Sequence, residues 1–142
     1  MRLAQSPEIK MAQKIIKRHS LKIPFDLDSL VKKYATVIYK SISVDGVDGV
    51  CLHLKTAGKT PTVIVNMDSA RTRQKFTLAH ELGHIIIPWH LGTFIDKVDE
   101  NNVNSNMEYW VLEREANRFA SELLMPFDWI YSLYQTNSDP HF

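Results

Sequence analysis

The chain of 142 residues fits one domain that can bury a core without disulfide bonds. Its hydrophobic fraction of 44% and charged fraction of 23% are typical of a soluble globular protein, and a net charge of +1 gives no general reason to bind nucleic acid or an anionic membrane. No apolar run approaches the roughly 18 residues needed to cross a bilayer, the amino terminus lacks a signal-peptide core, and Cys51 is the single cysteine. We therefore expect a cytoplasmic protein without an intrachain disulfide.

The amino-terminal part predicts two helices. Ser6 and Pro7 are typical of a helix start, and a helical stripe of apolar residues follows to about His19. After a break, Asp26 predicts the cap of a second, short helix. Residues 1–22 hold six Lys and Arg against one Glu, which we interpret as a solvated helix face rather than a nucleic-acid-binding arm.

Three β-rich stretches follow, separated by turns that contain glycine: Thr36–Tyr39, Val50–Leu54 and Thr62–Val65. They predict a small antiparallel sheet of about three strands. Cys51 alternates with the aliphatic residues of the second stretch, so we expect its thiol on the opposite strand face, as a structural group.

The second half predicts helices around a polar segment. Asp68 and Ser69 supply a cap, and Pro88 ends the helix because it cannot donate to the preceding turn. The expected segments are a helix from Ala70 to about Ile87, a mobile loop over 91–106, a helix over Met107–Leu124, a short helix over Phe127–Tyr134 and a loose tail over 135–142. The whole chain, 1–142, is thus predicted to be a single α+β domain.

The most informative motif is His-Glu-x-x-His, in which His80 and His84 stand four residues apart within the predicted helix. Residues at this spacing share one helix face, so two imidazole nitrogens are available to one metal ion. Neutral imidazole is a good Zn²⁺ ligand, and a catalytic zinc site needs three protein ligands and a water. Glu81 lies beside the pair and is the candidate general base for that water.

A third ligand must come from elsewhere in the chain. His90 has the spacing of the long metzincin motif, but that motif needs glycine where this chain has Ile87, and a β-branched residue resists the required positive φ. Glu113 shares a predicted helix face with alanines, whereas Glu115 aligns with charged residues on the opposite face. We therefore expect Glu113 to point inward as a ligand and Glu115 to be solvated.

Asn117, Arg71 and Arg73 are possible partners of this candidate site. Asn117, one turn further on, is placed to orient a ligating histidine through its second ring nitrogen. The alternative for Glu113 is an ion pair with Arg71 or Arg73, without a metal.

Two segments together resemble the ImmA/IrrE family of metallopeptidases: Phe76–His84 and Glu113–Pro126. The resemblance extends to Ile23–Leu27, to Asp45–Gly49 and to Ile64–Asn66, and covers roughly residues 20–130. It implies a small zincin-like domain with N-terminal helices, a three-stranded antiparallel sheet, a motif helix and a glutamate helix. It also implies zinc held by His80, His84 and Glu113, with Glu81 as the general base.

Members of this family are typical of phages, mobile elements and bacterial stress systems, where they relieve repression by cleaving or otherwise inactivating a helix-turn-helix repressor. The resemblance therefore implies a zinc-dependent endopeptidase with a repressor as protein substrate. A second hypothesis is a stoichiometric anti-repressor that binds without cutting and holds zinc as a structural ion; an intact Glu81 favours hydrolysis, because a structural site has no use for a base there.

The mechanism leaves two further choices open. We expect the substrate to add as an extended strand to an exposed sheet edge, either Val50–Leu54 or Thr62–Asn66. The group that stabilises the oxyanion is also undecided, with Tyr109 and His90 as candidates because they flank the motif segments in sequence.

Overall fold

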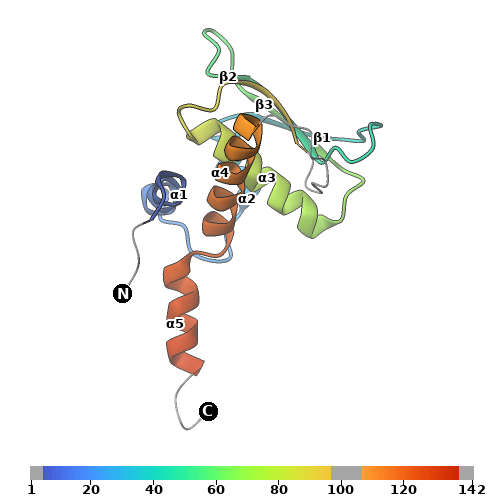
Figure 1. Ribbon diagram of the computed structural model, residues 1–142. Helices are drawn as coiled ribbons and strands as arrows, with labels where there is room; N and C mark the ends of the chain where they lie inside the picture. The colour runs from blue at the N-terminus through green and yellow to red at the C-terminus, as the bar shows by residue number, and fades with distance from the viewer. Residues whose placement is uncertain (1–4, 97–106, 138–142) are drawn as a thin grey trace.

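The computed structural model describes residues 5–96 and 107–137 and has the predicted α+β architecture (Figure 1). In chain order its elements are α1 (Pro7–Arg18), α2 (Leu27–Lys32), β1 (Thr36–Lys40), β2 (Gly49–Leu54), β3 (Thr62–Asn66), α3 (Arg71–Ile86), β4 (Gly92–Asp96), α4 (Met107–Leu124) and α5 (Phe127–Asn137). The helix and strand positions predicted from periodicity are therefore largely confirmed, whereas the sheet differs from its prediction.

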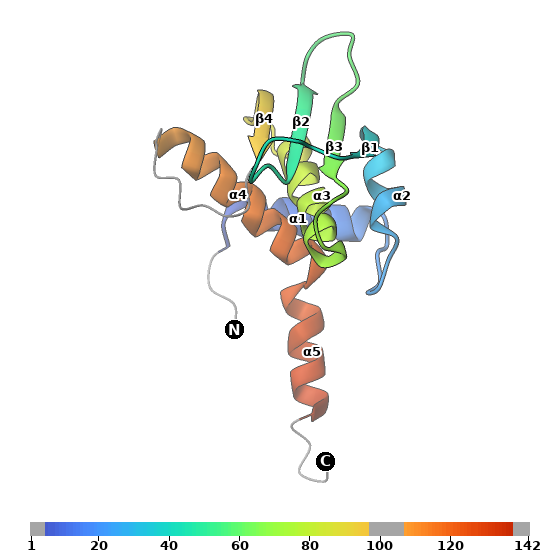
Figure 2. The same ribbon diagram turned by 90° about the vertical axis from the view of Figure 1, so that its right-hand side faces the viewer.

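The sheet has four strands in the order β1-β3-β2-β4 (Figure 2). β1 pairs with β3 in parallel, whereas β2 is antiparallel to both β3 and β4. The expectation of three antiparallel strands is wrong, because alternation of residue types predicts which faces a strand has but not which strand it pairs with. The expectation of a mobile loop is wrong for Gly92–Asp96, which forms β4; residues 97–106 lie outside the described residues.

Local capping explains the start of α2 and corrects the predicted start of α3. Asp26 caps α2 as predicted, since its carboxylate accepts from the backbone N–H of Ser29 at 3.1 Å. α3 instead begins after Ala70, without a side-chain cap. The predicted cap is wrong because its two side chains are engaged elsewhere: Ser69 contacts Asp48, and the Asp68 carboxylate accepts from the Ser41 hydroxyl.

The helix α3 lies at the centre of the core, where it contacts β2 and β3, α4 and α2. Cys51 on β2 is fully buried in this core, whereas Val50 and Leu52 on the opposite strand face are half-buried, so the predicted alternation is found for these two residues but not for Leu54, which is buried with Cys51. Burial raises the pKa of the Cys51 thiol to about 12, which keeps it protonated and consistent with the structural role expected for it.

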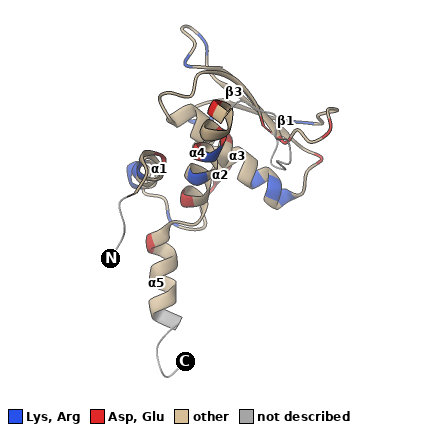
Figure 3. Cartoon of the chain, viewed as in Figure 1, with Lys and Arg blue, Asp and Glu red and all other residues tan. Residues whose placement is uncertain are grey.

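Basic residues gather on α1 and on the first turns of α3, whereas α5 carries little charge (Figure 3). The four basic residues of α1 are exposed, as expected for a solvated face: Lys10, Lys14, Lys17 and Arg18. None of the helices in the described ranges is long and apolar enough to cross a membrane.

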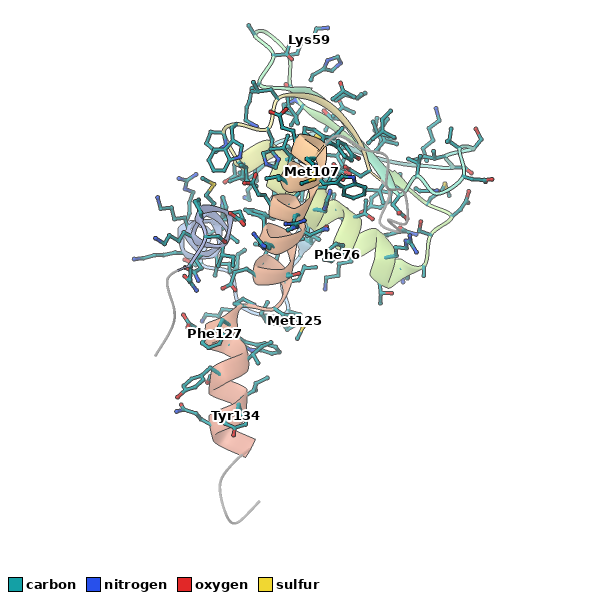
Figure 4. All side chains as sticks on the ribbon, in the orientation of Figure 1. Lys59, Phe76, Met107, Met125, Phe127 and Tyr134 are labelled. Atoms are coloured by element: carbon teal, nitrogen blue, oxygen red, sulfur yellow. The ribbon has the colours of Figure 1, made fainter. Side chains whose placement is uncertain are left out.

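The helix α5 extends away from the rest of the described fold (Figures 1 and 2). It reaches Asn137, three residues beyond the predicted end, so the expected loose tail is wrong for 135–137, while 138–142 lie outside the described residues. Its aromatic side chains are largely exposed, with Phe127 at its start and Tyr134 near its end (Figure 4).

The start of β2 approaches α3 so closely that only glycine fits there. A Cβ on Gly49 would lie 2.6 Å from Thr77 Cγ2 and 2.8 Å from Glu81 Oε2. We therefore expect Gly49→Ala to lower the free energy of unfolding by about 1–3 kcal/mol, because the buried strand or helix must shift. Urea unfolding would measure the change against the exposed-turn variant Thr60→Ala, and equal midpoints for the two variants would contradict the expectation.

Candidate metal centre

The centre is built on the second half of α3. The helical repeat brings His80 and His84 onto one face, where their Nε2 atoms lie 3.1 Å apart. Both imidazoles are buried, and the rings meet edge to face with centroids 4.7 Å apart. The spacing of the motif therefore places two ring nitrogens side by side, as the sequence predicts.

The helix α4 adds a carboxylate to this pair. Glu113 is buried, with one oxygen 2.8 Å from His84 Nε2 and the other 3.5 Å from His80 Nε2. The two helices approach closely at Gly83, where a Cβ would lie 3.3 Å from the Ala116 Cα. The alternative of an arginine partner for Glu113 is not supported, since Arg73 instead contacts Asp48 at 2.6 Å.

The structure adds a fourth group that sequence reasoning missed. Asp96, the last residue of β4, places its Oδ1 3.4 Å from His80 Nε2 and 3.3 Å from His84 Nε2. Its segment was expected to be a mobile loop, so its carboxylate was not considered. The signal was the short alternation that ends in Phe94, Ile95 and Asp96 after Gly92, which is typical of a strand.

Ligand atoms of His80, His84, Asp96 and Glu113 all lie within 4.8 Å of one another. Atoms bound to zinc at about 2.0–2.1 Å in tetrahedral geometry are about 3.3 Å apart. The two Nε2 atoms are 3.1 Å apart, and their contacts with the two carboxylates range from 2.8 to 3.5 Å. These spacings fit a tetrahedral metal ion.

Hydrogen bonding on the far side of each ring also fits a metal. His80 Nδ1 lies 2.8 Å from Asn117 Oδ1, the contact expected for Asn117. An amide oxygen only accepts, so His80 donates from Nδ1, and in the neutral ring the Nε2 lone pair faces the cluster. Burial lowers the pKa of His80, but Asp96 and Glu113 outweigh it and raise the value to about 10 in the metal-free chain.

His84 is oriented by a second histidine. Its Nδ1 lies 2.8 Å from His90 Nδ1, and His90 Nε2 lies 2.8 Å from Glu115 Oε1. Burial lowers the pKa of His90 to about 4, so the ring is neutral and uses its one proton on Glu115. His90 therefore accepts from His84 Nδ1, which leaves the His84 Nε2 lone pair directed at the cluster.

This chain of contacts corrects two expectations. Glu115 is not on a solvated face, because it accepts hydrogen bonds from Trp89 Nε1 at 2.8 Å and from His90. His90 is neither within the ligand cluster nor in position for an oxyanion, because it contacts His84 on the ring atom opposite Nε2. The prediction for Glu115 is wrong because its two partners, Trp89 and His90, come from the segment after α3, and helical spacing alone does not show how that segment folds back.

Because His90 fixes the ring of His84, we expect His90→Ala to weaken zinc binding by about 10- to 100-fold. Competition with a chromophoric chelator would measure the affinity. His19→Ala, which removes a histidine bonded to Tyr34 outside the centre, serves as the control. An unchanged affinity in His90→Ala would show that this contact does not support the site.

Glu81 lies beside the cluster, next to the Asp96 carboxylate. Its side chain is 0% exposed, and among the described residues no N–H group donates to either of its oxygens. Burial and the neighbouring Asp96 raise its pKa well above the ordinary value. A buried carboxylate to which no N–H group donates is costly, and such groups concentrate at functional sites.

The remaining oxyanion candidate, Tyr109, lies at the rim of the centre. Its hydroxyl donates to the Ile95 carbonyl at 3.0 Å and lies 3.5 Å from Glu113 Oε1. Tyr109 thus connects α4, the helix to which it belongs, with β4, and its role in the reaction stays a prediction.

The α+β fold and this cluster of two histidines and two carboxylates define a metallopeptidase type of domain. Residues 33–139 match the peptidase family M78, described as the IrrE N-terminal-like domain, and the chain belongs to this family. The resemblance found in the two motif segments is thereby confirmed, and membership supports a metallopeptidase-type function with a protein substrate. No curated protein matches the chain.

Proposed function

We propose that this protein is a zinc-dependent endopeptidase that inactivates a helix-turn-helix repressor by cutting it. The proposed zinc ligands are His80, His84 and Glu113, and the proposed general base is Glu81. One observation carries the proposal: two ring nitrogens and a carboxylate converge at spacings that fit a metal ion, beside the fully buried acid Glu81.

When bound, zinc would supply the Lewis acidity that activates water and polarises the scissile carbonyl. The residues of the chain orient the metal ligands and transfer the proton. Asn117 and His90 hold the two imidazoles in the tautomers that binding requires. Glu81 accepts the proton of the attacking water and returns it to the leaving amine, the role that its position between the cluster and β2 supports.

The substrate class follows from the family, and the repressor is the finer part of the proposal. A peptidase acts on a protein, and the resemblance to ImmA/IrrE proteins suggests a repressor. An extended substrate needs a free strand edge. Neither predicted edge is free, because Thr62–Asn66 (β3) lies between β1 and β2, and β2 lies between β3 and β4. Of the two, β2 is the strand next to the centre.

A second candidate function is the stoichiometric anti-repressor, which binds the repressor without cutting it. It is favoured by Asp96, which adds a fourth protein ligand, because structural zinc sites are closed by four such ligands. Such a site gives Glu81 no function, although burying this carboxylate is costly. Hydrolysis is therefore the better supported function.

Incubation with a candidate repressor would distinguish the two. The zinc-loaded protein is mixed with a helix-turn-helix repressor encoded beside its gene, and fragments are followed by mass spectrometry. We expect cleavage that a chelator stops and added zinc restores. An intact repressor that nevertheless leaves its operator would support the anti-repressor and overturn the peptidase.

A further inference from the structure

The strand β4 occupies the edge of β2 next to the metal centre. The two strands pair antiparallel, with Gly49 opposite Asp96 and Cys51 opposite Phe94. The other edge of β2 is taken by β3, so both edges of β2 are already paired within the chain. A substrate strand that pairs with β2 must therefore displace β4.

The same strand delivers a carboxylate into the centre. Asp96 is 2% exposed, its Oδ1 faces both Nε2 atoms, and its carboxylate also lies next to Glu81. Two imidazoles and Glu113 already give the three ligands of a catalytic zinc site. Asp96 therefore stands where an open site would hold water.

Outside its pairing with β2, the attachment of β4 to the other described elements is limited. Gly92, Thr93 and Ile95 are exposed, and only Phe94 and Asp96 are buried. The pairing with β2 is interrupted by a register shift between Cys51 and Leu54. A five-residue edge strand with two buried side chains is weakly held compared with a core element.

Two contacts outside the sheet position the strand. The Phe94 ring stacks on His84 with centroids 4.0 Å apart and an interplanar angle of 16°. The Tyr109 hydroxyl, from α4, donates to the Ile95 carbonyl at 3.0 Å. Both contacts come from residues at the metal centre, so the site and the strand hold each other in place.

We propose that β4 is an internal inhibitory strand: it takes the place of a substrate strand on β2, and Asp96 is a displaceable fourth metal ligand that closes the site. Withdrawal of β4 would expose the edge of β2 and, at the same time, free the fourth coordination position of the metal. The proposal rests on the proposed peptidase function for the identity of the competing strand, but the closure of the centre is testable without hydrolysis.

Acetohydroxamic acid, a small metal-binding probe, tests the closure directly. Isothermal titration would measure its affinity for the zinc-loaded wild-type protein and for Asp96→Ala, with the exposed-residue variant Thr93→Ala as control. If the open state of the wild type is about a tenth of the population or less, removing Asp96 raises the probe affinity about tenfold or more. Zinc stays at one ion per chain at saturation, because three ligands remain.

Hydrogen exchange supplies a second readout. We expect zinc to slow amide exchange in 92–96 in the wild type but not in Asp96→Asn, which keeps the side-chain shape and so guards against a folding defect in Asp96→Ala. Equal probe affinities in wild type and both Asp96 variants would overturn the proposal, as would complete loss of zinc from both variants. Tighter probe binding without any cleavage of repressor would uphold the closed site while the peptidase function fails.

Discussion

Replacement of Glu81 by Gln is expected to reduce peptide hydrolysis by about 10²- to 10⁴-fold while zinc binding is retained. The amide has nearly the shape of the carboxylate but cannot accept the proton of the attacking water. Glu81 lies outside the set of ligand atoms, so the metal site itself stays intact. Cleavage of the repressor, followed by fragment mass spectrometry with elemental analysis of the same sample, measures both properties.

Glu108→Gln is the matched control, because it makes the same chemical change at an exposed position on α4. We expect this control to cleave at the wild-type rate. If Glu81→Gln derepresses as fully as the wild type, Glu81 is not the base and the peptidase function is lost with it. The anti-repressor would then be the function that remains.

Glu113→Ala is expected to lose zinc, with an affinity more than about 100-fold lower, a larger effect than loss of a group that only orients a ligand. The variant removes the carboxylate that α4 contributes to the cluster. Metal affinity depends directly on the number and charge of the ligands. Elemental analysis after dialysis against a fixed concentration of zinc would show the loss. His80→Ala is expected to behave in the same way.

Two glutamate variants on the same helix separate ligand loss from general damage. Glu108→Ala should keep one zinc per chain. Glu115→Ala should also keep its zinc at saturation, but with lower affinity, because Glu115 acts on the metal only through His90. Loss of zinc from Glu115→Ala together with retention in Glu113→Ala would show that the ligands have been assigned to the wrong helix face.

The two pairs of histidine contacts explain why the centre is organised before a metal arrives. Asn117 and His90 each accept a hydrogen bond from the Nδ1 of one of the two imidazoles on α3, so both Nε2 atoms are directed inward. Asp96 and Glu113 then concentrate negative charge around the same point. Metal binding to such a site replaces repulsion between buried carboxylates with attraction to a cation, which ties metal loading to stability.

Local spacing along the chain was sufficient to predict that His80, His84 and Glu113 would be brought together. A separation of four residues puts His80 and His84 on one face of any α-helix, and the alanines beside Glu113 indicated which face of the second helix would be buried. Asn117, one turn from Glu113, was expected to contact one of the two histidines, and the structure shows that this histidine is His80. These predictions depend on the 3.6-residue repeat alone, which is fixed once a segment is helical.

Only the tertiary structure decided which side chains from strands and turns lie at the site. The order β1-β3-β2-β4 and the burial of Asp96 depend on which strand pairs with which, and alternation along a single strand contains no such information. The contact of Glu115 with His90 likewise depends on how the segment after α3 folds back. The sequence by itself thus determined which side chains on the helices come together, His80, His84 and Glu113. The carboxylate of Asp96 and the supporting histidine His90 were instead set by long-range pairing and packing.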